Sequence, residues 1–214
     1  TLNTADRHNW NDHSREFIFA SSNYTVHNFF YDNVSRPIRN ATLYIPNGTP
    51  PSGGWPLVSF WHGGFYAAGN KADVDMNWVR WLLYNGFAVS TGEWIVGQAM
   101  INNPFAIGTW PNANSGRFPS FVIDPKLFAL YMTQKGTSGD NTYPINTELM
   151  CITGHSAGGG IALMAGVSRD LVLNGRDLTV NNPLYGYRTA TPDPEFKCIY
   201  VYSPPTDMKW AFDN

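Results

Sequence analysis

The chain has 214 residues, which is enough for one domain with a substantial core. Aromatic residues make up 15% of it, which excludes a disordered chain, and two cysteines are too few for a disulfide framework. Only 14% of the residues are charged and the formal net charge is −2, which argues against nucleic acid or an anionic membrane surface as a partner, because both need clustered Lys and Arg.

Residues 1–15 are polar and aperiodic and predict an N-terminal arm, and residues 16–214 predict a single domain. No apolar run is long enough for a membrane-spanning helix. Low charge, many Asn and few Cys favour a secreted protein. In that setting four sequons would accept glycans, although an Asn-rich chain also produces sequons by chance. They begin at Asn23, Asn33, Asn40 and Asn47.

Short apolar runs alternate with helical patterns along the chain, which predicts a mostly parallel α/β sheet without an internal domain boundary. Asp124 and Pro125 predict the N-cap and first turn of the second helix. Residues 97–120, rich in Gly, Pro and Asn, predict a long surface loop. Residues 17–19, 24–31 and 41–45 predict two or three strands, and further strands are expected at 57–61, 87–90, 149–153 and 198–202. Helices are expected at 74–84, 124–135 and 161–173.

The segment Gly154-His155-Ser156-Ala157-Gly158 fits the pattern G-x-S-x-G between a predicted strand and a predicted helix. A sharp turn at this place needs Gly on both sides of the nucleophile, and it lifts the Ser156 hydroxyl to the carboxyl edge of the sheet. The glycines from 154 to 160 predict a turn that ends where the helix begins at 161. The alternative interpretation is an unrelated Gly-rich strand-to-helix turn.

A second motif, His62-Gly63-Gly64-Phe65, directly follows the strand expected at 57–61. The tetrahedral intermediate of acyl transfer carries an oxyanion, which needs fixed N–H donors. One donor would be the N–H of Ala157, and the others would come from residues 63–65. A simple turn that uses Gly for its positive φ is the alternative.

With these two motifs in this order, the sequence resembles the α/β-hydrolase superfamily, closest to esterases and lipases with an HGGG-type oxyanion loop. Tyr44-Ile45-Pro46, Trp55 to Gly64, Ile145 to Gly159 and Ser203 to Asp207 carry the likeness. The resemblance implies an α/β fold with a mostly parallel central sheet, helices on both faces and its last strands missing from this chain. Phe65 stands where the third Gly of HGGG is usual, so the donors are either Gly63 and Gly64 or Gly64 and Phe65.

The triad order in this fold is Ser, then Asp or Glu, then His, but no His follows Ser156. We therefore expect the acid and the base downstream of Asn214, in a further segment or a second chain. Asp207 is an alternative acid, although a structural Asp is the simpler interpretation. His62 and His155 lie beside the motifs, and neither is expected to be the base.

Cys151 and Cys198 fall on strands that the resemblance makes neighbours, and two buried free thiols are expected there, because a bridge between such strands would be strained. No metal is expected. Asp6, His8, Asp12 and His13 fit a solvated arm, and Asp73 and Asp75 fit a helix N-terminus. Trp61 and Trp94 are expected in the core, while Tyr66 and Trp110 could line a substrate pocket.

The leading hypothesis is a secreted serine hydrolase that cleaves small carboxylic esters through an acyl-enzyme on Ser156 and needs no cofactor. Two alternatives remain open: a peptidase of the prolyl-oligopeptidase type, and a catalytically inactive α/β-hydrolase domain used for binding or adhesion.

Overall fold

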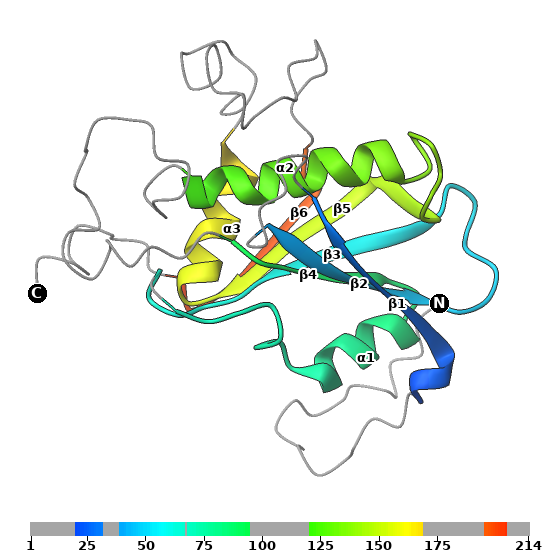
Figure 1. Ribbon diagram of the computed structural model, residues 1–214, viewed down its shortest axis with the longest axis horizontal. Helices are drawn as coiled ribbons and strands as arrows, with labels where there is room; N and C mark the ends of the chain where they lie inside the picture. The colour runs from blue at the N-terminus through cyan, green and yellow to red at the C-terminus, as the bar shows by residue number, and fades with distance from the viewer. Residues whose placement is uncertain (1–19, 32–38, 67, 95–119, 169–194, 205–214) are drawn as a thin grey trace, which may run out of the picture.

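The computed structural model describes residues 20–31, 39–66, 68–94, 120–168 and 195–204 (Figure 1). Strands and helices alternate after the first two strands, as the sequence predicts. The strands are β1 (Tyr24–Phe30), β2 (Asn40–Pro46), β3 (Trp55–Trp61), β4 (Ala88–Gly92), β5 (Ile145–His155) and β6 (Cys198–Tyr202). The helices are the 3₁₀ turn η2 (Ser21–Asn23), α1 (Met76–Tyr84), α2 (Ser120–Lys135) and α3 (Ala157–Val167).

All six described strands form one sheet in the order β1-β2-β4-β3-β5-β6. The pairs β1–β2 and β2–β4 are antiparallel, whereas β4–β3, β3–β5 and β5–β6 are parallel. The sheet is thus parallel from β4 to β6, which confirms the predicted fold class. Because parallel strands all end on the same edge, the loops that follow β3 and β5 lie together there.

Helices cover both faces of the sheet. In Figure 1, α1 lies on one side of the strands, and α2 and α3 lie on the other. Neighbouring residues of β3 show the division, since Leu57 packs into the core under α2 and α3, whereas Val58 packs with Val79 and Leu83 on the α1 side. Burial on both faces explains why these strands are continuous apolar runs in the sequence.

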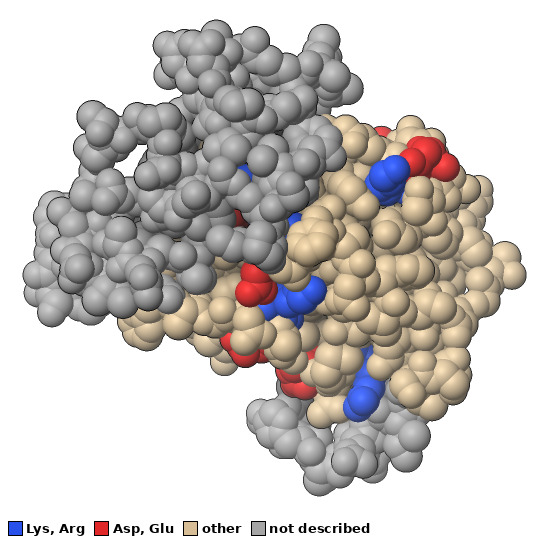
Figure 2. All heavy atoms as spheres, in the orientation of Figure 1, with Lys and Arg blue, Asp and Glu red and all other residues tan. Residues whose placement is uncertain are grey.

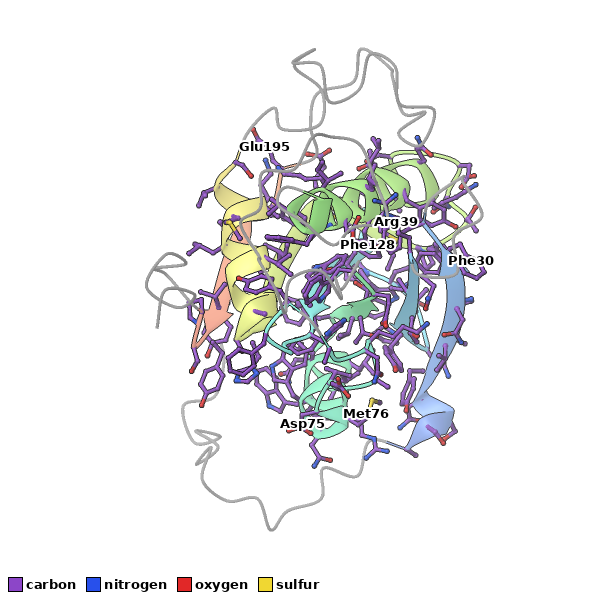
Figure 3. All side chains as sticks on the ribbon, turned by 60° about the vertical axis from the view of Figure 1, so that its left-hand side comes forward. Phe30, Arg39, Asp75, Met76, Phe128 and Glu195 are labelled. Atoms are coloured by element: carbon purple, nitrogen blue, oxygen red, sulfur yellow. The ribbon has the colours of Figure 1, made fainter. Side chains whose placement is uncertain are left out.

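The start of α2 differs from the prediction. The helix begins at Ser120, so Pro125 lies inside it and Asp124 is no N-cap. Asp124 is instead completely buried, and its Oδ1 accepts a hydrogen bond of 2.8 Å from Nε of Arg39, which is also completely buried. Figure 3 shows Arg39 near Phe128 of α2. The Asp124 side chain, which the local sequence predicts to cap the helix, therefore forms a tertiary ion pair between α2 and the start of β2 instead.

The start of α1 agrees better with its local sequence. Asp75 is the N-cap, and its carboxylate accepts the N–H of Asn77 at 2.8 Å (Figure 3). Asp73 has a different role, because its carboxylate accepts the N–H of Asn70 at 2.8 Å in the turn before the helix. At the other end, the N–H of Gly86 bonds to the carbonyl of Leu83, with φ at 79°, as expected of a glycine that ends a helix.

Two further expectations were wrong. The glycines from 158 to 160 are not part of a turn, because α3 begins at Ala157 and includes them in its first turn. The apolar run at 198–202 predicts a buried strand, but β6 is not buried on both faces, since Tyr200 and Tyr202 are about 60% exposed. Among the described helices, none has both the length and the apolar character needed to cross a membrane.

Candidate functional site

The two sequence motifs meet at the carboxyl edge of the sheet. Strands β3 and β5 are parallel neighbours, and Trp61 at the end of β3 pairs with Gly154 near the end of β5. The residues that follow them, His62-Gly63 and Ser156, are therefore adjacent. A Cβ placed on Gly63 would lie 3.2 Å from Cβ of Ser156 and 3.0 Å from the carbonyl oxygen of His155.

Ser156 sits at a strained turn between β5 and α3, with φ 53° and ψ −123°. A non-glycine residue rarely adopts this conformation, and such strain costs about 1–3 kcal/mol. Two backbone hydrogen bonds hold the turn: the N–H of Ser156 donates to Tyr202 at 3.0 Å, and its carbonyl accepts from Gly160 at 3.0 Å. The turn thus has the geometry that the G-x-S-x-G pattern predicts.

The glycines around Ser156 let three backbone segments approach closely. A Cβ on Gly154 would lie 2.4 Å from the Gly158 oxygen, and one on Gly158 would lie 2.0 Å from the Trp61 oxygen. Real Cβ atoms do not come this near to backbone oxygens. Glycine at these two positions is therefore required by packing between β3, β5 and α3.

The N-terminus of α3 points its free N–H groups at this edge. In any helix the first N–H groups have no acceptor within the helix, and together with the helix dipole they favour negative charge. Ala157 is the first residue of α3 and is 1% exposed. Its N–H is thus available to a negatively charged atom next to Ser156.

The loop after β3 folds back on itself through positive φ angles at three consecutive residues: Gly64 (121°), Phe65 (53°) and Tyr66 (60°). The N–H of Ala68 donates to the Gly64 oxygen at 2.9 Å and closes the loop. The side chain of Tyr66 is 2% exposed, whereas that of Phe65 is 84% exposed. The Phe65 ring thus points away from the core.

His62 anchors this loop. Its Nδ1 lies 2.7 Å from the carbonyl oxygen of Gly63, and its ring stacks on Trp94 with the centroids 5.1 Å apart. Nε1 of Trp94 in turn donates to the carbonyl of His62 at 3.1 Å. A carbonyl and the N–H of the same trans peptide point in opposite directions, so the contact with Gly63 also fixes the direction of the Gly64 N–H.

None of the three described histidines reaches the Ser156 hydroxyl with a hydrogen bond. His62 is held as above, the ring of His155 lies 5.4 Å from that of Tyr202, and the ring of His27 lies 5.1 Å from that of Tyr143. Asp207 lies outside the described residues. The structure therefore brings Gly63, at the start of the loop, next to Ser156, and leaves the predicted acid untested.

The aromatic residues near the site belong to the core. Trp61 and Trp94 are 0% and 1% exposed, as expected. Tyr66, considered for a substrate pocket, packs instead on Trp94 and Phe121, with centroids 5.8 and 5.0 Å apart. Burial raises the pKa of the Tyr66 phenol well above its usual value. Trp110 lies outside the described residues.

Sequence reasoning missed one element of the site, the carbonyl of Tyr202, which accepts the Ser156 N–H. A backbone carbonyl can belong to any residue type, so only the pairing of β5 with β6 could have revealed this acceptor.

Among the described residues, no group of three or more His, Cys, Asp or Glu side chains could hold a metal ion. Asp6, His8, Asp12 and His13, expected in a solvated arm, lie outside the described part of the chain.

The six-stranded order, the strained serine turn and the helix behind it define an α/β-hydrolase fold. Comparison with family models agrees: residues 42–213 match the BD-FAE model, and the chain belongs to this family, which is an α/β-hydrolase-like esterase domain. No curated protein matches the chain significantly.

Solved structures of similar fold include several esterases. A truncated carbohydrate esterase from gut microbiota is 23% identical over 88% of this chain and 60% of its own, with a TM-score of 0.63. A bifunctional GH43-CE protein of Bacteroides eggerthii is 20% identical over 89% of this chain and 22% of its own, with a TM-score of 0.63. Esterase Est22 is 19% identical over 68% of this chain, with a TM-score of 0.51, and the matched part spans 39% of the Est22 chain. At these identities the likeness concerns the fold.

Proposed function

We propose that the chain carries the nucleophile and the oxyanion loop of a serine hydrolase that cleaves carboxylic esters. The observation that carries the proposal is the contact between the loop after β3 and the strained turn at Ser156. Membership of an esterase family and the esterases among its structural neighbours support it.

In the proposed reaction the Ser156 hydroxyl attacks the ester carbonyl carbon while a histidine base removes its proton. The carbonyl oxygen becomes an oxyanion, which accepts hydrogen bonds from the N–H of Ala157 and from the loop of residues 63–65. The alcohol leaves with a proton from the histidine. Water then attacks the acyl-enzyme and regenerates Ser156.

The Gly64 N–H is the loop donor whose direction the structure restrains most, because His62 holds the carbonyl of the same peptide. Phe65 is the next candidate, since its backbone N–H can donate whatever its side chain. We assign His62 the task of positioning this loop. The base and the acid of the triad are assigned to residues outside the described ones, with Asp207 as a candidate acid.

For the substrate we propose an uncharged ester borne by a carbohydrate. Two structural neighbours, a carbohydrate esterase and a bifunctional GH43-CE protein, suggest the carbohydrate. Only 14% of the residues are charged and the net charge is −2, which favours an uncharged ester. On the face drawn in Figure 2 the described charged side chains form small, separate groups.

Secretion and glycosylation remain part of the proposal. The sequon residues Asn23 and Asn47 are exposed, although Nδ2 of Asn47, the atom that would carry the glycan, donates to the carbonyl of Ser22 at 2.7 Å. Asn23 is therefore the better acceptor of the two. Asn40 is a poorer acceptor because it lies in β2, and the hydroxyl of its sequon partner Thr42 is buried and donates to Asn28 at 2.7 Å. Asn33 lies outside the described residues.

A fluorophosphonate probe on the protein in its complete natural length tests the function. We expect covalent labelling that disappears in Ser156→Ala, together with loss of hydrolysis of acetylated oligosaccharides. A folded protein that takes no label would contradict the enzyme and favour the binding module. Labelling without action on the acetylated sugars would contradict only the proposed substrate.

A further inference from the structure

The two cysteines face each other across neighbouring strands. Cys151 of β5 and Cys198 of β6 are direct partners in the parallel register. Strands in a sheet lie about 4.8 Å apart, and disulfides join Cα atoms about 4.4–6.8 Å apart. The register therefore places the two cysteines side by side on neighbouring strands.

The surroundings of the two thiols differ. Cys151 is half-buried and packs against the apolar cluster under α1, which includes Val58 and Val79, whereas Cys198 is exposed. Burial, and then the hydrogen bond with Cys198, raises the pKa of the Cys151 thiol to about 12. Both cysteines were expected to be buried, and the open position of Cys198 corrects that expectation.

We propose that Cys151 and Cys198 form a modification site, at which a hydroperoxide converts the two free thiols into an intramolecular disulfide. The thiolate of the exposed Cys198 attacks the peroxide, the O–O bond breaks, and the sulfur becomes a sulfenic acid while the other oxygen leaves as water or an alcohol. The sulfur of Cys151 then attacks Cys198, and its proton leaves with the sulfenic hydroxyl as a second water. The two thiols lose two electrons, and the peroxide gains them.

The cross-link would act on the strand that ends at Ser156. Cys151 lies on β5 upstream of the serine, and β6 supplies the Tyr202 carbonyl that accepts the Ser156 N–H. Disulfides in register on parallel neighbours are strained, and strained disulfides are the easily reduced ones. The bridge is therefore reversible by a mild reductant, and it tightens the pairing of β5 with β6 below the serine turn.

The test is oxidation of the protein with hydrogen peroxide, stopped with catalase. We expect the intact mass to fall by two hydrogen atoms, a non-reducing digest to join the peptides of Cys151 and Cys198, and a phosphine reductant to restore the thiols. In Cys151→Ser the same treatment should leave oxygen adducts on Cys198. In Cys198→Ser the buried thiol should react much more slowly.

The same peroxide oxidation, repeated in urea, shows whether the disulfide forms because the folded sheet places the cysteines together or because they meet at random in the unfolded chain. The bridge should form faster in the folded chain than in the unfolded one, because only the folded sheet holds the cysteines together. Oxygen adducts on wild-type Cys198 without a cross-link, a bridge between two molecules, or equal rates in urea would each overturn the proposal. Because the readout is mass and not hydrolysis, the result is independent of the proposed function.

Discussion

Gly158 of α3 lies directly against Trp61 of β3: a Cβ on Gly158 would be 2.0 Å from the Trp61 carbonyl oxygen and 2.3 Å from that of His62. The contact ties the helix that begins behind Ser156 to the strand that carries the oxyanion loop. The first turn of α3 is thus fixed by backbone packing, with no side chain between the elements.

Gly158→Ala should therefore lower the free energy of unfolding by about 3 kcal/mol or more, as overpacking against backbone does. Gly159→Ala is the matched control, because its Cβ would meet its nearest atoms at 3.1–3.3 Å, and a helical Ala gains about 1 kcal/mol over Gly. Urea denaturation of both variants measures the difference. Equal losses would contradict the steric account.

Two replacements of Ser156 test its backbone strain and its proposed role as nucleophile separately. Ser156→Gly relieves the positive φ, whereas Ser156→Ala keeps it, so the Gly variant should be more stable than the Ala variant by about 1 kcal/mol. Under the proposed function, neither variant reacts with a fluorophosphonate. Thermal unfolding and probe labelling, measured on the same samples, check the two expectations, and an Ala variant as stable as the Gly variant would exclude stored strain.

Phe65 and Tyr66 share a positive φ but differ in packing. Phe65→Gly should raise the free energy of unfolding by about 1 kcal/mol, because it relieves strain and removes an exposed ring that packs on nothing in the core. Tyr66→Gly should lower it by about 3 kcal/mol or more, since the lost contacts with Trp94 and Phe121 outweigh the relieved strain. The opposite order in chemical denaturation would refute this account.

The buried pair of Arg39 and Asp124 should be sensitive to removal of one partner. Asp124→Asn or Arg39→Met alone leaves a buried charge uncompensated and should lower the free energy of unfolding by about 3–5 kcal/mol. The double variant Arg39→Met/Asp124→Asn should lose less than the sum of the single variants. A double-mutant cycle in urea measures this coupling, and strict additivity would show that the two charges do not interact.

His62→Phe keeps a ring to stack on Trp94 but removes the Nδ1 contact with Gly63. If His62 positions the oxyanion loop, this change lowers kcat about tenfold or more and leaves KM nearly unchanged, since the lost interaction belongs to the transition state. Ester hydrolysis by the complete protein measures both constants. A rise in KM alone would assign His62 to substrate binding.

Local sequence predicted much of the site because its chemistry depends on residue type. The glycines around Ser156 and the run of apolar residues at 57–61 marked a strand-to-helix turn and a buried strand, and both are present. Chain order alone could not show that the loop after β3 touches the turn after β5. That contact follows from the sheet order, in which β3 and β5 are neighbours.

Where a prediction was wrong, a tertiary contact or the position of a strand in the sheet outweighed the preference of the local sequence. Asp124 resembles an N-cap, but the buried Arg39 binds it, and the helix starts four residues earlier, at Ser120. Likewise, an apolar run such as 198–202 predicts a buried strand, but only the assembled sheet determines which strand lies at the edge of its described part.

The sequence by itself determined the fold class, the serine turn and the glycines that it requires, because these depend on local backbone freedom and on the periodicity of apolar residues. The tertiary structure alone decided how the His62–Phe65 loop meets Ser156, which carbonyl holds the serine N–H and how the two cysteines come into register. These relations join residues far apart in the chain, and only the order and direction of the strands determine them.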